Sequence, residues 1–248
     1  MNSNASRPSN LQDQVLIVTG GTGALGSAVS ASLLDAGARV IVTYIVDEEY
    51  AELAASIAET RDAQTAGRLS GRKVDVTDES AVNEFFQTTA SEHSRLDGLV
   101  HIAGGFVYAG LVETSTEQFD RMWNLNLRSL FLCGRAAYPL LKQSRGAIIT
   151  IGARPGLQGT AGLSAYAASK AGVINFTQTV ADEGRADGVR AFSVLPSIID
   201  TPANRAAMPD ADFNSWVTPA SLARVIRFAL EEESRDMSGA VLPVYGGA

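Results

Sequence analysis

The sequence has little of what disulfide-linked, metal-binding and membrane-spanning proteins need. Its single cysteine, Cys133, cannot form a disulfide within the chain, and this favours a cytoplasmic protein. Its two histidines, His93 and His101, lack the Cys/His spacing of a zinc site, so no metal is expected. No run of about 18 apolar residues occurs, so no membrane-spanning helix is expected. The polar start, residues 1–10, has no apolar core segment and does not resemble a signal peptide.

Clustered basic charge is also missing. The net charge is −7 and no Lys/Arg cluster occurs, so the contacts to phosphate that nucleic-acid binding requires are not available. The chain does have apolar side chains, which make up 46% of its 248 residues and can form a sizeable core. No linker rich in Pro, Gly or Ser divides the chain. We therefore expect a flexible N-terminus at residues 1–10 and one domain at 11–248.

Short apolar runs alternate with longer amphipathic stretches. The runs are continuous rather than alternating, which is typical of parallel strands covered by helices on both faces. The pattern predicts a single-domain α/β protein with a doubly wound, mostly parallel, seven-stranded Rossmann-like sheet. The expected strands are Val15–Thr19, Val40–Tyr44, Lys73–Val76, Gly98–Ile102, Ala147–Ile151, Ala191–Leu195 and Ala240–Val244. The expected helices are Ala24–Ala36, Glu48–Arg61, Glu79–Ser91, Glu117–Leu141, Ser164–Ala186 and Ala220–Glu232.

Local signals mark some of these boundaries. Thr114 and Glu117 fit a capping box, and Thr218 fits an N-cap followed by proline at the first helical position. The longest stretch without periodicity is Pro196–Val217. It follows the sixth strand, on the side where such sheets bind ligands.

A glycine-rich loop follows the first strand and precedes the first helix. Gly21, Gly23 and Gly26 fit the Gly-x-Gly-x-x-Gly pattern, whose glycines allow close approach to a pyrophosphate. The free N–H groups of the following helix favour the same anion. We therefore predict a dinucleotide site formed by Gly20, Gly21, Thr22, Gly23, Ala24, Leu25 and Gly26. A tight turn in a protein that binds no cofactor is the alternative.

The tip of the second strand bears on the choice between NAD and NADP. An acidic residue there binds the ribose 2′-hydroxyl, and an arginine accommodates a 2′-phosphate. Tyr44 stands at this tip, and Asp47 comes three residues later. The missing carboxylate permits NADP, so the sequence leans toward NADP.

Tyr166 and Lys170 open the helix that follows the fifth strand. Their spacing of four residues places them on one face of a helix. A nearby ammonium lowers the pKa of a phenol, so the pair can supply a proton during hydride transfer. A surface pair without function is the alternative for this motif alone.

Together these features resemble the short-chain dehydrogenase/reductase family along the whole chain. The matching pieces are Thr19–Gly26, Asp75-Val76, Ala103-Gly104, Asn126-Leu127, Tyr166 with Lys170, Pro196, Thr201-Pro202 and Gly246-Gly247. The resemblance implies that Asp75 and Val76 contact the adenine, and that Ala103 and Gly104 line the cofactor ribose. It further implies that Pro196, Ile199 and Thr201 hold the carboxamide and phosphate side, that Lys170 binds the nicotinamide ribose, and that Asn126 supports a proton relay. The family also implies a homodimer or homotetramer through the helices at Glu117–Leu141 and Ser164–Ala186.

The departures from the family pattern narrow the chemistry. Ala153 stands where the family has its catalytic serine, so no hydroxyl polarises a simple carbonyl. The chain resembles the dihydropteridine reductases in this alanine, in Ala103-Gly104-Gly105-Phe106, and in the stretch from Leu195 to Trp216. This resemblance implies reduction of a quinonoid dihydropteridine or a similar conjugated ring. Ala153 and Phe106 would then face the substrate.

Alternatives remain open for the substrate and for single residues. The enzyme could act on another carbonyl or alcohol, with Ser164 or a water replacing the serine, or the chain could bind a dinucleotide as a regulator without turnover. Phe106, Tyr108 and Trp216 could stack on a flat ring or pack within loops. We expect His101 to be a hydrogen-bonded structural residue and Ser164 to cap its helix. Arg154 could bind substrate or remain solvated.

Overall fold

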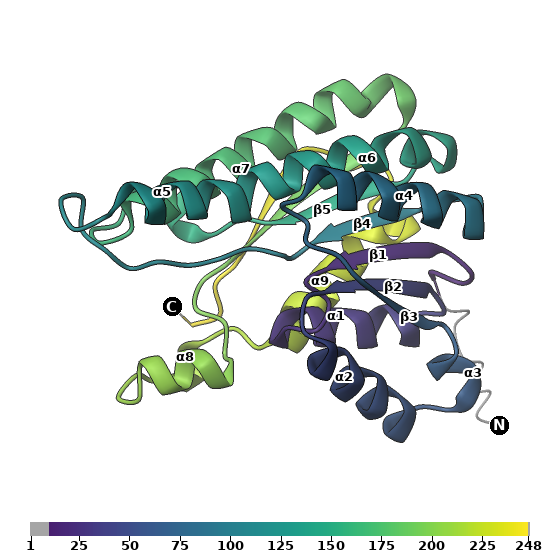
Figure 1. Cartoon of the computed structure of the whole chain (residues 1–248), viewed down its shortest axis with the longest axis horizontal. Helices are drawn as coiled ribbons and strands as arrows, with labels where there is room; N and C mark the ends of the chain where they lie inside the picture. The colour runs from purple at the N-terminus through teal and green to yellow at the C-terminus, as the bar shows by residue number, and fades with distance from the viewer. Residues whose placement is uncertain (1–9, 248) are drawn as a thin grey trace.

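One seven-stranded sheet runs through the computed structural model, which describes residues 10–247 (Figure 1). The strand order is β3-β2-β1-β4-β5-β6-β7, and every neighbouring pair is parallel. The doubly wound sheet is thus confirmed, but it is wholly rather than mostly parallel. Of the predicted flexible segment 1–10, all but Asn10 lies outside the described residues. The strands are β1 Val15–Thr19, β2 Arg39–Tyr44, β3 Leu69–Lys73, β4 Gly98–His101, β5 Ala147–Ile151, β6 Arg190–Pro196 and β7 Ala240–Val244.

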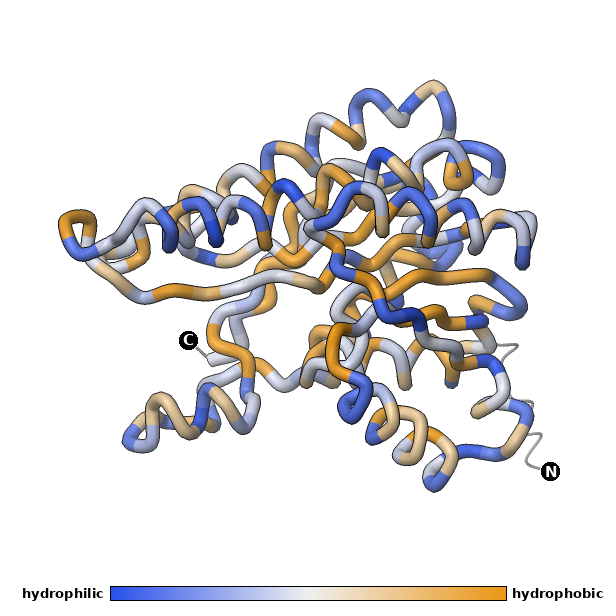
Figure 2. The backbone as a smooth tube through the Cα atoms, viewed as in Figure 1, coloured by the Kyte–Doolittle hydropathy of each residue, from blue (hydrophilic) through white to orange (hydrophobic). Residues whose placement is uncertain are grey.

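Helices cover both faces of this sheet. Along β1, Leu16 and Val18 join one buried cluster with α1 and α9, while Val15 and Ile17 join a second with α4, α6 and α7. This explains why the central strands β1 and β5 are almost continuously apolar, in keeping with the hydropathy colouring of the sheet (Figure 2). The α-helices are α1 Ala24–Asp35, α2 Asp47–Thr60, α3 Ala63–Ala66, α4 Glu79–His93, α5 Thr116–Trp123, α6 Ser129–Ser144, α7 Ser164–Glu183, α8 Pro202–Ala207 and α9 Pro219–Leu230.

Four local predictions differ from the structure. β3 ends at Lys73 instead of beginning there, because an edge strand needs little apolar sequence. The expected long helix from Glu117 is two helices, α5 and α6, joined by a π-helical turn at Asn124–Arg128. The capping box is formed by Ser115 and Gln118 rather than by Thr114 and Glu117. The stretch Pro196–Val217 contains α8 and a 3₁₀ turn. The N-cap at Thr218 is confirmed.

The direction of chain winding reverses between β1 and β4. These strands lie side by side, with Thr19 opposite His101, although β2 and β3 come between them in sequence. Ligands of doubly wound sheets bind in the crevice at such a point, beyond the carboxyl ends of the strands. The glycine loop after β1 and Ala103-Gly104 after β4 both lie at this edge. The segment carrying α8 projects from the same side of the sheet (Figure 1).

Candidate active site

The conformation of the loop after β1 requires glycine at several positions. Gly20 has a φ of +63°, a conformation that favours glycine. A Cβ at Gly21 would lie 2.5 Å from the side chain of Val42, and one at Gly26 would lie 2.7 Å from the Cα of Gly21. Gly23 precedes α1 without a side-chain cap, so no side chain competes for the first N–H groups of that helix. The loop therefore fits the pyrophosphate of a dinucleotide.

A buried chain of hydrogen bonds connects this loop to the π-helical turn. The Oγ1 of Thr19 lies 3.0 Å from Nδ1 of His101, and Nε2 of His101 lies 3.1 Å from Oγ of Ser129. The Ser129 hydroxyl donates its hydrogen bond to the carbonyl of Leu125, so it accepts a hydrogen bond from the Nε2–H group of His101. The other ring nitrogen, Nδ1, then carries no hydrogen and accepts a hydrogen bond from the Thr19 hydroxyl. Burial lowers the pKa of His101 to about 3. His101 is therefore a neutral structural residue, which confirms the prediction.

Asn126, on the π-helical turn, holds the chain after β4 against α7. Its Oδ1 accepts from the N–H of Gly105 at 2.9 Å, and its Nδ2 donates to the carbonyl of Gly105 at 3.1 Å. Nδ2 also donates to Oγ of Ser169 at 2.9 Å. A Cβ at Gly104 would lie only 2.6 Å from Oδ1 of Asn126. Asn126 thus fixes the position of this loop, and its role in a proton relay remains a proposal.

Tyr166 and Lys170 lie on one face of α7, as predicted. The Nζ of Lys170 is 5.9 Å from the centre of the Tyr166 ring and donates to the carbonyl of Ile151 at 2.8 Å. Burial lowers the pKa of Lys170 to about 8. Burial also raises the pKa of Tyr166 to about 12. The predicted lowering of the tyrosine pKa is therefore not seen, because desolvation of the phenol is the dominant effect.

An aromatic side chain lies beside this pair. The ring of Phe106 meets the ring of Tyr166 edge to face, with centroids 4.9 Å apart, and is 61% exposed. Ala153, two residues beyond the end of β5, is buried and carries no hydroxyl. The next residue, Arg154, is exposed, and its guanidinium lies 5.2 Å from the centre of the Tyr245 ring.

The other predicted cofactor residues follow the ends of β2, β3 and β6. Tyr44 stacks on Tyr50, with ring centroids 4.7 Å apart. Val76 is buried, whereas Asp75 is exposed and accepts from the N–H of Thr77. Pro196 ends β6, Ile199 forms an isolated bridge with Val217, and Thr201 caps α8.

Of the two alternatives for Trp216, stacking on a flat ring or packing within loops, the structure shows the second, whereas the expected helix cap at Ser164 is wrong. Trp216 is buried against Phe213, so it packs within the segment before α9. Ser164 begins α7 without capping it, and its Oγ lies 3.4 Å from Oγ1 of Thr114. Ser169 was missed, although it stands inside the Tyr166–Lys170 motif.

Within residues 10–247, no group of three or more His, Cys, Asp or Glu side chains is placed to hold a metal ion. No helix within that range is long and apolar enough to cross a membrane.

Comparison with known proteins places this geometry in a family. The family described as short chain dehydrogenase matches residues 14–212. The chain belongs to the short-chain dehydrogenase/reductase family. The 3-oxoacyl-(acyl-carrier-protein) reductase of Synechocystis sp. is 34% identical, with coverage of 96% of this chain and 97% of the relative. The cyclopentanol dehydrogenase of Comamonas sp. is 31% identical, with coverage of 96% and 97%.

A solved structure supports the same assignment. A short-chain type dehydrogenase/reductase from Mycobacterium ulcerans has a TM-score of 0.89 and 25% identity, with coverage of 96% of this chain and 90% of that chain. The protein is therefore an oxidoreductase of a family that uses NAD(P)(H). None of these three proteins is named a dihydropteridine reductase.

Proposed function

We propose that this oxidoreductase reduces a flat conjugated ring, with a quinonoid dihydropteridine as the best fit. The observation that carries the proposal is the buried methyl group of Ala153, two residues beyond the end of β5. An isolated carbonyl needs a hydrogen-bond donor there to stabilise its developing charge, whereas a conjugated ring distributes that charge. The exposed ring of Phe106, beside Tyr166, provides an aromatic surface for such a substrate.

Three residues carry the proton chemistry in this proposal. The bound nicotinamide cofactor supplies the hydride. Tyr166 donates the proton from its hydroxyl, which its raised pKa keeps protonated at neutral pH. Lys170 stabilises the phenolate left behind and holds the cofactor ribose, and Asn126 keeps the loop of Gly104 and Gly105 in place for a proton relay.

The second candidate substrate is a simple ketone or alcohol. The named activity of cyclopentanol dehydrogenase, a relative at 31% identity, favours it. In that case a water or the hydroxyl of Ser164 would replace the missing serine.

Ala153→Ser separates the two substrates. With a quinonoid dihydropterin, we expect kcat to change by less than about threefold, because the new hydroxyl has no isolated carbonyl to polarise. With a simple ketone as the true substrate, kcat should rise by about 10²–10³, the usual contribution of such a donor. Steady-state rates with both substrates provide the measurement. Ala168→Ser, the same change at an exposed position of α7, is the control. A large gain on ketones alone would reject the conjugated-ring assignment.

The cofactor proposal is NADH or NADPH. An uncharged Tyr44 at the tip of β2 permits NADP(H), toward which the sequence leans. The carboxylates in the first turn of α2 would repel the 2′-phosphate of NADP(H) and so favour NAD(H).

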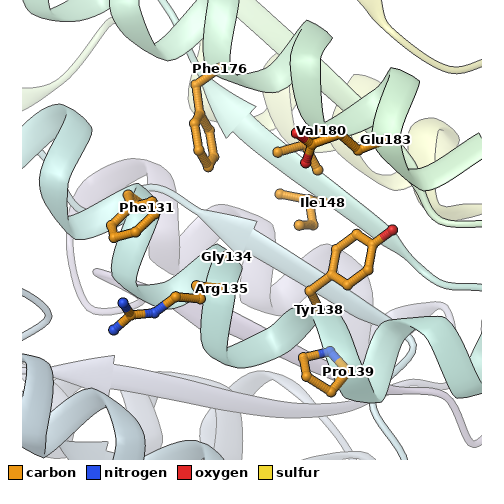
Figure 3. A pocket seen from close by; sticks show the side chains of 9 residues that line it. All are labelled: Phe131, Gly134, Arg135, Tyr138, Pro139, Ile148, Phe176, Val180 and Glu183. Carbon is orange, nitrogen blue, oxygen red and sulfur yellow. The ribbon is translucent and has the colours of Figure 1, made fainter.

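For assembly, we propose a homodimer or homotetramer formed through α5, α6 and α7. This surface exposes the aromatic rings of Phe119, Trp123 and Phe131, each by more than 40%. It also contains a hollow of about 280 Å³ between α6 and α7, where Phe131, Tyr138 and Phe176 lie around Ile148 (Figure 3). Exposed apolar surface of this kind is typical of protein interfaces.

Light scattering tests this assembly directly. We expect at least twice the monomer mass at micromolar concentration. Phe131→Glu should reduce the mass, because it introduces a charge into the apolar contact. Phe228→Glu on α9, which is 38% exposed on the opposite face of the sheet, should not. A monomeric wild-type protein would contradict the proposal.

A further inference from the structure

A carboxylate of α2 is hydrogen-bonded to the phosphate loop. Oγ1 of Thr22 donates to Oε2 of Glu49 at 2.8 Å, although the two residues are 27 positions apart. The loop is also joined to the end of β2, because the N–H of Gly21 donates to the carbonyl of Thr43 at 3.1 Å. Glu49, in the first turn of the helix that follows β2, therefore lies against the phosphate loop.

This position is where a carboxylate can act on the cofactor ribose. In sheets of this type the 2′ position of the adenosine ribose faces the end of the second strand. The side chain at that tip, Tyr44, is uncharged and stacked on Tyr50. Glu49 brings the missing carboxylate to the same edge from the next helix.

Two cationic side chains at the end of β3, Arg72 and Lys73, form ion pairs with other carboxylates. Nζ of Lys73, at the end of β3, lies 2.5 Å from Oδ2 of Asp47. The guanidinium of Arg72 bonds both carboxylate oxygens of Glu92, at 3.0 and 2.7 Å. A 2′-phosphate would thus meet the Glu49 carboxylate without either of these two cations to neutralise it.

We infer that the Glu49 carboxylate makes this enzyme select NAD(H) over NADP(H). The inference rests on the cofactor-binding role of the phosphate loop in the proposed function, and it opposes the lean toward NADP predicted from Tyr44 alone. Acidic residues in a first helical turn also stabilise the helix through its dipole. That effect explains the acidic residues of α2 but not the bond between Glu49 and Thr22.

The test is the affinity of NADH and NADPH, measured by fluorescence titration without any substrate. The wild type should bind NADPH at least about tenfold more weakly than NADH, and this ratio should shrink as salt screens the charges. Glu49→Gln removes the charge but keeps an oxygen that can accept from Thr22. It should tighten NADPH binding severalfold and leave NADH binding within about twofold.

Glu59→Gln is the matched control. It removes the same charge from the same helix, at a position about 15 Å further along the helix axis. At physiological salt, ions screen most of the electrostatic interaction over that distance. It should leave both affinities unchanged.

Three results would overturn the inference: a wild type that prefers NADPH, a Glu49→Gln variant in which both affinities change equally, or equal effects of the two variants. Failure of the cofactor-binding role on which the inference rests gives a different result, since neither cofactor would then bind.

Discussion

Replacing Tyr166 by phenylalanine should lower kcat by about 10²–10⁴, the range expected for loss of a general acid. The hydroxyl is the only group removed, and the phenyl ring can still meet Phe106 at the edge-to-face distance of 4.9 Å. Cofactor affinity should therefore change little. Steady-state kinetics at saturating cofactor, together with a cofactor titration, measure both quantities.

The matched control is Tyr108→Phe. Tyr108 is 72% exposed on the same loop as Phe106, and losing its hydroxyl should alter kcat by less than about threefold. Equal losses in the two variants would mean that Tyr166 has no special role. A Tyr166→Phe enzyme with full activity would show that another group or a water supplies the proton.

Replacing Lys170 by methionine should lower kcat by about 10²–10³ and weaken cofactor binding about tenfold, because one ammonium has two proposed tasks. Methionine keeps most of the buried volume, so the fold should be retained. Circular dichroism and thermal melting verify that the variant is folded. An enzyme that loses kcat but binds the cofactor normally would show that the lysine acts only on Tyr166.

The dependence of the wild-type kcat on pH also tests the role of the Lys170 ammonium. Burial holds the pKa of Lys170 at about 8, below its ordinary value, so the charged form is present below that pH and is lost above it. The reductive kcat should therefore fall as the pH rises through about 8. Tyr166, with a pKa of about 12, stays protonated over this range. The Lys170→Met variant should lack this decline, and a decline that persists in it would assign the titration to another group.

The strand–loop–helix unit around Gly20–Gly26 could be predicted because local physics determines it. A positive φ at Gly20 and the close contacts of Gly21 and Gly26 require glycine, and such requirements are visible in the sequence. The hydrogen-bonded role of His101 could also be predicted, since it is the last residue of a buried strand.

Other features depend on contacts between distant parts of the chain. The π-helical turn interrupts an apolar pattern that continues smoothly through Asn126, so periodicity alone predicts one long helix. Thr114 and Ser115 both fit a capping pattern. Which of them is the N-cap of α5 depends on where the preceding loop ends. The bond from Thr22 to Glu49 joins two elements whose approach is set by the sheet. The pKa values of Tyr166 and Lys170 depend on burial, which the motif does not specify.

The most direct test of the central claim is the kcat/KM of the wild-type enzyme for a quinonoid dihydropterin and for a panel of cyclic and linear ketones, with oxidation of NADH and NADPH followed optically. Because the turn after β5 has the methyl group of Ala153 and no hydroxyl at this position, the pterin should be reduced with the highest kcat/KM, at least about tenfold above any ketone. A ketone reduced as efficiently as the pterin would contradict the account, as would a failure to oxidise either cofactor with any member of the panel.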